Sequence, residues 1–296
     1  MLTAIIAVTL TAPDLHSVED AYGRWFGYRV VDRGLVSKEL AAGWGAPLAE
    51  GRQYVLMQPA SGSPTYLRVV QSPATPGYEV MKTHGWNSNE ILVEDPDALA
   101  EQLKGSPFRI VGPPRPLSTN GKVRAMQVIG PAGELNYLTR IPADGGSVFI
   151  NTPAQSFVDR TFIVVLGGAS MAAMQAFYRD RLGIPVTDPV PARINVLQDA
   201  YRLPREFETP LAIVRFSTGF VIELDEYPTQ ATPRPRRDGD LPPGMAMVSF
   251  TVRSLEERKL VWKVPPSVRP EAPYAGRRAG VIEGAAGEWL ELVEAP

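Results

Sequence analysis

The chain of 296 residues contains an internal repeat, which restricts its possible folds more than any other feature of the sequence. Identical residues recur 156 positions apart: Leu10 and Leu166, Tyr22 and Tyr178, and Gly27 and Gly183. In both copies a β-branched segment (IIAVTL, FIVVL) leads into an amphipathic helix, a glycine turn and a second short strand. The repeat therefore predicts a fold made from copies of one small unit.

The later parts of the two halves also correspond. We predict short strands at residues 64–71 and 219–226, strands running into helices at 89–103 and 248–260, and closing strands at 133–139 and 287–293. Each half then contains two strand–helix–strands units, giving four in all. Asp14 is suited to cap the first helix, because its carboxylate can accept a free backbone N–H. We expect modules over residues 1–145 and 159–296, joined by a linker over residues 146–158.

Composition excludes several classes of function. The chain has no cysteine and only two histidines, so it can form no disulfide, thiolate metal site or three-histidine site by itself. Its 30 basic and 32 acidic residues give a net charge near −2, which argues against a nucleic-acid partner. Its 29 prolines favour short elements and many turns, because proline interrupts helices and central strands.

No segment is apolar for long enough to span a bilayer. The most apolar run, residues 162–174, contains glycines and is shorter than the roughly 18 residues required. Residues 1–14 lack the basic start of a signal peptide. We therefore expect a cytoplasmic protein, monomeric or homodimeric, with no membrane partner.

Six phrases carry the strongest family signal: AVTLTAPDLHSVEDAYGRWFGYRVV, NEILVEDPDALAEQL, GPAGELNYLTR, MAAMQAFYRDRLGIPV, GFVIELDEYP and GAAGEWLELVE. Together they cover nearly the whole chain, which resembles the vicinal oxygen chelate superfamily of glyoxalases, bleomycin-resistance proteins and extradiol dioxygenases. The resemblance implies an α+β fold of two tandem glyoxalase-like modules, in which βαβββ units pair into half-open curved sheets. Each such cup would hold a small ligand.

In metal-dependent members of this superfamily, His or Glu side chains project into the cup from a few strand positions. The resemblance places Ala7, Arg68, Ser88 (or Asn89) and Tyr137 at these positions in the first half, and Ile163, Glu223, Met247 and Glu291 in the second. The first half retains none of the usual ligands, and the second retains two carboxylates. This implies a site without a metal or other cofactor. The alternative is a divalent metal, such as Mg²⁺, Ca²⁺ or Mn²⁺, held by Glu223 and Glu291.

Glu223 and Glu291 are the first candidates for catalysis. They lie in the apolar strands VIEL and WLELV, where alternate residues share one face. If both face a cup, burial and mutual repulsion would raise at least one pKa and suit general acid–base catalysis; the alternative is that one or both face solvent. His84 is a further candidate for proton transfer because histidine titrates near neutral pH, and the alternative is an exposed loop residue.

Arg68 and Tyr137 are candidates for substrate binding. In a cup, either side chain could stabilise an oxyanion; otherwise Arg68 forms an ion pair or faces outward, and Tyr137 is a core aromatic. Trp86 and Asn89, near His84, could form the rim of a ligand site or simply belong to a turn.

Two insertions, residues 35–52 and 191–208, are predicted to contain short helices. Their Trp44 and Tyr201, with Met247, could wall an apolar pocket, and the alternative is packing on the sheet. A proline-rich segment at residues 227–244, with Arg234, Arg236 and Arg237, could form a lid over an acidic ligand.

The leading hypothesis is a metal-independent enzyme, an isomerase or lyase that transfers a proton on a small apolar oxygenated or aromatic compound. The superfamily resemblance supplies these reaction classes. One alternative is a protein that binds a small molecule without changing it, as the bleomycin-resistance members do. Another is a metal-dependent dioxygenase- or glyoxalase-like enzyme with an atypical site.

Overall fold

The computed structural model describes residues 2–117, 121–142, 153–219 and 221–296, and these form four successive units. The first unit comprises β1 (Leu2–Ala12), α1 (Leu15–Phe26), β2 (Arg29–Leu35), α2 (Lys38–Trp44), the 3₁₀ turn η1 (Pro47–Ala49), β3 (Gln53–Gln58) and β4 (Tyr66–Gln71). The second comprises β5 (Gly85–Val93), α3 (Pro96–Gln102), β6 (Arg109–Pro116), β7 (Arg124–Ile129) and β8 (Leu135–Arg140).

The second half repeats this order. The third unit comprises β9 (Val158–Gly168), α4 (Met171–Ala176), the π-helical segment η2 (Phe177–Arg181), β10 (Val190–Ala192), α5 (Asn195–Tyr201), β11 (Thr209–Arg215) and β12 (Val221–Glu226). The fourth comprises β13 (Met245–Val252), β14 (Val264–Val268), β15 (Arg278–Glu283) and β16 (Trp289–Glu294). The predicted strands and the short helices of both insertions are present.

The four units pair into two eight-stranded sheets, and each sheet takes one unit from each half of the chain. The terminal sheet joins the first and fourth units in the order β14-β15-β16-β13-β1-β4-β3-β2. The central sheet joins the second and third units in the order β10-β11-β12-β9-β5-β8-β7-β6. The α+β class and the paired units are therefore confirmed. The predicted linker at residues 146–158 separates the two halves of the sequence repeat, but each sheet contains one unit from either side of it. Residues 143–152 lie outside the described residues.

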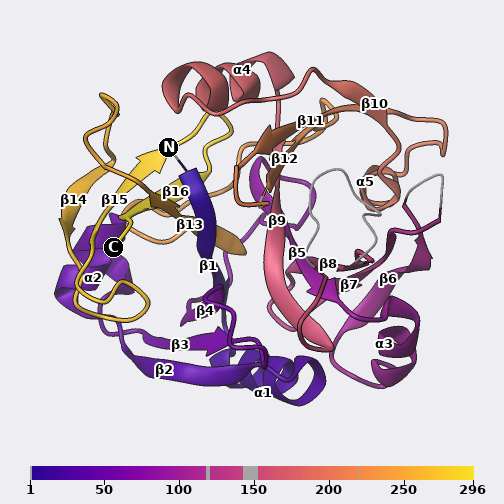
Figure 1. The fold of residues 1–296 in the computed structure, drawn as a ribbon, viewed down its shortest axis with the longest axis horizontal. Helices are drawn as coiled ribbons and strands as arrows, with labels where there is room; N and C mark the ends of the chain where they lie inside the picture. Colours follow the sequence, from indigo (N-terminus) through magenta and orange to yellow (C-terminus); the bar gives the residue numbers. More distant parts are fainter. Residues whose placement is uncertain (1, 118–120, 143–152, 220) are drawn as a thin grey trace.

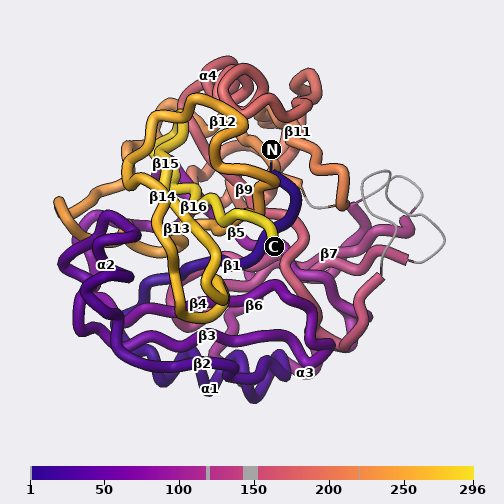
Figure 2. Tube along the Cα trace, turned by 60° about the vertical axis from the view of Figure 1, so that its left-hand side comes forward, coloured from indigo at the N-terminus to yellow at the C-terminus, as the bar shows by residue number. Residues whose placement is uncertain are grey.

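The main core lies between the two sheets. Figure 1 shows the sheets side by side, with β1 and β13 beside β5 and β9. The facing sides of both sheets pack with apolar residues of α1, α3 and α4, and Figure 2 shows α1 and α3 along one edge of the molecule. The opposite sides of the sheets form two concave surfaces, named here the terminal cup and the central cup. The insertion helices α2 and α5 pack on these surfaces.

Local sequence explains where several helices begin and why one is missing. Asp14 caps α1 as predicted, with its Oδ1 accepting the backbone N–H of Ser17 at 3.1 Å. The helix expected at the end of residues 248–260 does not form; β13 is followed by an irregular segment. From the end of β13 to residue 260, Val252 and Leu255 are the buried residues, so a helix in this segment would have almost no apolar face to pack. Within the described residues, no helix is long and apolar enough to cross a membrane.

Two equivalent buried hydrogen bonds connect elements of the two sheets. The Tyr22 hydroxyl on α1 donates to Glu134 at 2.7 Å, just before β8 of the central sheet. The Tyr178 hydroxyl of η2 donates to Glu288 at 3.0 Å, just before β16 of the terminal sheet. Burial raises the pKa of both carboxyl groups to about 7. Each half of the repeat therefore uses one tyrosine and one glutamate to fix its two units together.

The glycines of the phrases GPAGE and GAAGE are required by these glutamates. A Cβ atom at Gly130 would lie 1.9 Å from Oε1 of Glu134, and one at Gly284 would lie 1.9 Å from Oε1 of Glu288. Only glycine leaves space for the carboxyl group beside the backbone. The repeated phrase is thus a structural motif that positions a buried acid.

We predict that Tyr22→Phe and Tyr178→Phe will each lower the free energy of unfolding by about 1–3 kcal/mol, because a buried carboxyl group loses its donor. Urea unfolding measures this change. Tyr66→Phe is the matched control, since this partly buried tyrosine makes no side-chain hydrogen bond within the described residues. A loss below about 0.5 kcal/mol in both variants would show that these bonds add no net stability.

Candidate active site

The strand alternation places the predicted candidates on the concave faces of two different sheets. Glu223 on β12 and Tyr137 on β8 face the central cup, because the alternate residues of these strands lie in the main core. Arg68 on β4 and Glu291 on β16 face the terminal cup for the same reason. Glu223 and Glu291 therefore belong to separate sites and do not act as a pair.

In the terminal cup, a buried network surrounds Arg68 and Glu291, which are 1% and 0% exposed. An NH1 atom of Arg68 lies 3.9 Å from Oε2 of Glu291 and donates to the hydroxyl of Thr9 at 3.4 Å. Glu291 accepts hydrogen bonds from the hydroxyl groups of Tyr274, at 2.8 Å, and Ser249. The charge of the arginine is thus balanced within the protein.

Aromatic side chains enclose the guanidinium group of Arg68. Its Cζ lies 5.0 Å from the ring centre of Trp44 and 5.2 Å from that of Tyr274, which permits cation–π attraction. The Trp44 indole N–H donates to the Tyr274 hydroxyl at 3.0 Å. Because Trp44 comes from α2, the first insertion fills this cup with packed side chains. Met247 belongs to the same buried cluster.

The terminal cup does not fit a divalent metal. One row of the sheet carries Ala7, Ser249 and Glu291 side by side, so only one of these three offers a carboxylate. The guanidinium cation of Arg68 already lies beside that carboxylate. A metal ion there would be repelled by the arginine and would find too few anionic ligands.

The central cup contains three carboxyl groups. Glu90 on β5 lies opposite Ile163 and Tyr137 on the neighbouring strands, and it accepts a hydrogen bond from Thr139 at 2.5 Å. Glu223 and Asp225 share one face of β12. No lysine or arginine of the described residues forms an ion pair with any of the three. Their negative charge is therefore not balanced as it is in the terminal cup.

Burial raises the pKa of all three carboxyl groups. The pKa of Glu90 rises to about 7, although the hydrogen bond from Thr139 opposes the rise. Burial, followed by the charges of Asp225 and Glu90, raises the pKa of Glu223 well above its ordinary value. Burial also raises the pKa of Asp225. At neutral pH the cluster therefore holds protons that it can donate, and it can accept them back.

Several buried polar atoms of this cup have no hydrogen-bond partner within the described residues: Ser88 Oγ, Gln127 Nε2 and Asp225 Oδ1. Ser88 shares the cup face of β5 with Glu90, and Gln127 lies opposite Tyr137 on the next strand. Buried polar atoms normally have partners, so these donors and acceptors point to a polar group bound in the cup.

A cavity of about 370 Å³ lies at the mouth of the central cup. It is walled mainly by apolar side chains, among them Ile129 and Leu135 of the sheet and Val196 of α5. Leu135 and Tyr137 share one face of β8, so this wall continues toward the carboxyl groups. The second insertion therefore covers part of its cup and leaves an opening, whereas the first fills its cup.

The central cup also does not fit a metal. No group of three or more His, Asp or Glu side chains among the described residues is arranged to hold a metal ion. A metal shared by Glu223 and Glu291 is ruled out by their positions in different sheets.

The candidates near His84 lie away from both cups. Trp86 is 1% exposed in the main core, where its indole N–H donates to the Trp289 carbonyl at 2.8 Å. Asn89 is buried on the core face of β5 and donates to Asn136. His84 is half-buried, and burial, followed by the charge of Arg234, lowers its pKa. None of the three lines the candidate cavity.

The proline-rich segment is held in place by its arginines. Arg234 donates to the carbonyl groups of Met245, at 2.8 Å, and Trp86, and lies over the ring of Tyr78. Arg236 pairs with Glu283 at 2.7 Å. The segment connects β12 to β13 in the chain, and the contacts of Arg234 fix it against β5 and the start of β13. The lid hypothesis for Arg234 has no support in this arrangement.

One predicted residue and two residues that were not predicted belong to the central cup. Tyr201, at the end of α5, packs in the apolar cluster that includes Tyr137. Glu90 and Asp225 are functional candidates that sequence reasoning missed. The signal for Asp225 was its spacing of two from Glu223 within one strand. Glu90 offered no such signal, because every residue of β5 is buried and alternation is hidden.

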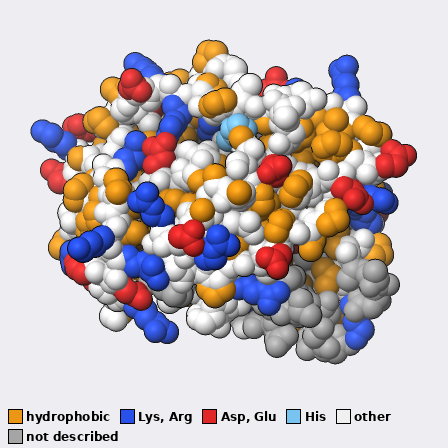
Figure 3. Space-filling model, turned by 90° about the horizontal axis from the view of Figure 1, so that it is seen from above, with side chains coloured by type: hydrophobic (Ala, Val, Ile, Leu, Met, Phe, Trp, Pro, Cys, Tyr) orange, Lys and Arg blue, Asp and Glu red, His pale blue; other side chains and the backbone are white. Residues whose placement is uncertain are grey.

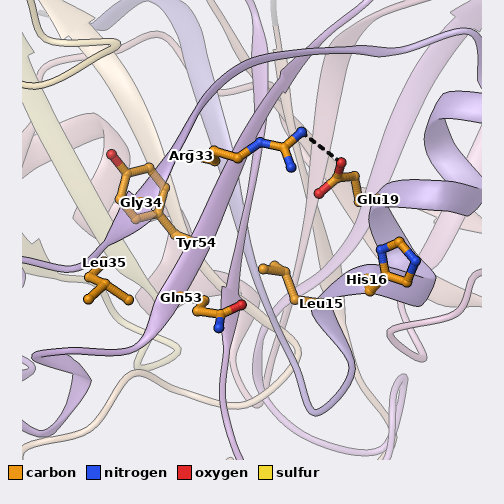
Figure 4. A pocket seen from close by; sticks show the side chains of 8 residues that line it. All are labelled: Leu15, His16, Glu19, Arg33, Gly34, Leu35, Gln53 and Tyr54. Carbon is orange, nitrogen blue, oxygen red and sulfur yellow. Dashed lines mark hydrogen bonds and ion pairs between the residues drawn. The ribbon is translucent and has the colours of Figure 1, made fainter.

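A separate hollow of about 380 Å³ lies between α1, the edge strand β2 and its neighbour β3. Figure 4 shows His16 at its border and the Arg33–Glu19 ion pair, 2.9 Å long, across it. Its charged lining residues Arg33 and Glu19 are paired with each other, and neither is one of the candidates that the sequence predicts. On the face seen in Figure 3, acidic and basic side chains are interspersed among apolar ones.

We predict that Arg68→Met and Glu291→Gln will each lower the free energy of unfolding by about 3–5 kcal/mol, since each leaves a buried polar or charged group without its partner. Denaturant unfolding measures this. The double variant Arg68→Met with Glu291→Met should recover much of the loss, because it removes both charges. Equal losses in the double and single variants would contradict the interpretation of a balanced pair.

We predict that stability falls as the pH rises from about 4.5 to about 7. Glu90 has its ordinary pKa of 4.5 in the unfolded chain and about 7 in the folded chain, so the folded chain binds more protons in this range. Unfolding by urea between pH 5 and pH 8 measures the slope. Glu90→Gln should flatten it by roughly 2 kcal/mol over this range, whereas exposed Glu101→Gln should not. An unchanged slope in Glu90→Gln would refute the raised pKa.

No protein-family model matches the chain, and neither does any curated protein sequence. Solved structures do match it. Glyoxalase I from Zea mays has a TM-score of 0.64 and 15% identity over 98% of this chain and 92% of its own. A putative dioxygenase from Bacillus subtilis has a TM-score of 0.58 and 12% identity over 100% of this chain and 86% of its own.

At these identities the likeness establishes the fold, and it confirms at that level the resemblance found in the sequence. The chain has the fold of the vicinal oxygen chelate superfamily in its two-module form.

Proposed function

We propose that the central cup is the active site of an enzyme that transfers a proton on a small, largely apolar, oxygenated compound, as an isomerase or a lyase. One observation carries this proposal. Buried Glu90 and Asp225 and partly buried Glu223 have raised pKa values and no ion-pair partner among the described residues, and they lie beside buried polar atoms that lack partners there. Perturbed carboxyl groups of this kind are typical of acid–base sites.

The three carboxyl groups can divide the roles of acid and base between them. Repulsion prevents all three from ionising together near neutral pH, so ionised and protonated groups coexist. Glu223 is the proposed base, because it has neighbouring carboxyl groups and no hydrogen-bond donor that would lower its basicity. A protonated neighbour, or the hydroxyl of Tyr137, donates to the oxygen on which charge develops.

The substrate class follows from the walls of the cup. Apolar side chains line the cavity at the mouth, whereas donors and acceptors lie deeper. A compound with an apolar body and one carbonyl or hydroxyl group would meet both. The relatives in fold are named as a glyoxalase and a putative dioxygenase, which supports an enzyme. We assign Arg68 and Glu291 a structural role, and we propose chemistry that needs no metal.

Each cup is completed by strands of one chain, which supports a protein that can act as a monomer. Neither cup would need strands from a second copy of the chain. A cytoplasmic location stays a proposal based on the sequence.

The proposal predicts hydrogen exchange at carbon. The protein is incubated in D₂O with a panel of small aromatic and aliphatic ketones and aldehydes, and proton NMR follows deuterium uptake and isomerisation. For a compound that reacts, Glu223→Gln should lower the rate by about 10²–10⁴-fold, because the base is lost. Glu101→Gln, an exposed change on α3, is the matched control. Equal rates in these two variants would refute the role of Glu223.

The same experiment separates the alternatives. A protein that only binds would broaden the signals of a compound and return it unchanged. A metal-dependent enzyme would lose its rate in chelator and regain it with a divalent ion, whereas the proposed enzyme keeps its rate in chelator.

A further inference from the structure

The apolar wall of the cavity continues along β7 and β8 of the central sheet. Ile129 on β7 pairs with Leu135 on β8, and both line the cavity at the mouth. Tyr137 lies two residues further along the same face and interacts with the charges of Glu223 and Asp225. The cavity therefore lies beside the strand face that carries Tyr137.

The charges at the mouth differ in kind from those inside. Two charged side chains line this cavity within the described residues, Arg109 on β6 and Asp199 on α5. Asp199 is already paired, since its Oδ1 lies 2.6 Å from an NH2 atom of Arg205. Arg109 is exposed and has no ion-pair partner among the described residues. The mouth therefore carries an unpaired cation, whereas the interior carries three carboxyl groups, with the charge of Arg115 on β6 acting on Tyr137.

This arrangement also fixes the direction of a charged ligand. An anionic group pushed toward Glu90, Glu223 and Asp225 would leave water and be repelled by any of them that is ionised. At the mouth, the same group would remain partly hydrated and meet the guanidinium of Arg109, whose planar donors match a carboxylate. An apolar anion is therefore stable in only one orientation, with its uncharged end inside.

We infer that the natural ligand of the central cup is an apolar compound with a single carboxylate, that Arg109 binds this carboxylate at the mouth, and that the reacting oxygenated end points inward. This inference rests on the proposed function for its inner end. It makes Arg109 a residue that determines specificity and orientation, not a catalytic residue. The cavity of about 370 Å³ suits a ligand of one ring and a short chain.

The test compares matched carboxylates and amides as probes. Benzoate, phenylacetate, phenylpropionate and phenylbutyrate, with their primary amides, are titrated into the full chain by calorimetry at low ionic strength. At least one carboxylate should bind about ten-fold more tightly than its amide, and salt should reduce the difference. Arg109→Gln should abolish the preference, Arg109→Lys should keep part of it, and Arg29→Gln, an exposed change on the terminal sheet, should keep all of it.

The inference is overturned if no carboxylate binds, if each carboxylate binds no better than its amide, or if Arg109→Gln retains the preference. Because the readout is binding, its failure differs from a failure of the proposed function. A carboxylate preference in a protein that catalyses no hydrogen exchange would refute the enzyme and support the recognition by Arg109. Exchange without any carboxylate preference would support the enzyme and refute this recognition.

Discussion

The burial of the Arg68 guanidinium group determines how the terminal half of the molecule is built. A charge at this depth is tolerated only where hydrogen bonds and opposite charge surround it, and Glu291, Tyr274 and Trp44 supply that environment. Glu291 lies on β16 and Tyr274 in the turn between β14 and β15, both in the fourth unit, and Trp44 ends the helix of the first insertion. These contacts occupy the Glu291 carboxylate and pack Trp44 and Tyr274 against the arginine.

The two cups have the same architecture but differ in how their buried charges are balanced. One balances a buried cation with a buried anion and packs closed. The other leaves Glu223 and its neighbours without an ion-pair partner among the described residues, which costs stability. Such a cost is typical of functional sites, which is why we propose the second cup, and not the first, as the active site.

Sequence patterns predicted what is local and missed what depends on pairing. The strands, the Asp14 cap and the helices of both insertions followed from residue type and spacing. The pairing of units across the two halves did not, because either pairing keeps the same alternation of buried and exposed residues, and so Glu223 and Glu291 were expected together. Glu90 was not predicted because its strand is buried along its whole length. The helix predicted after β13 does not form because the segment lacks an apolar face.

The pairing of the first unit with the last has a consequence for biosynthesis. The central sheet comes from one continuous stretch, residues 85–226, but β1 must wait for β13, whose strand leaves the ribosome more than 200 residues later. Until then the paired edge of β1 is open, and open strand edges invite association between chains. The half of the molecule that closes last is the one held by Arg68, so ion-pair formation there coincides with completion of the chain.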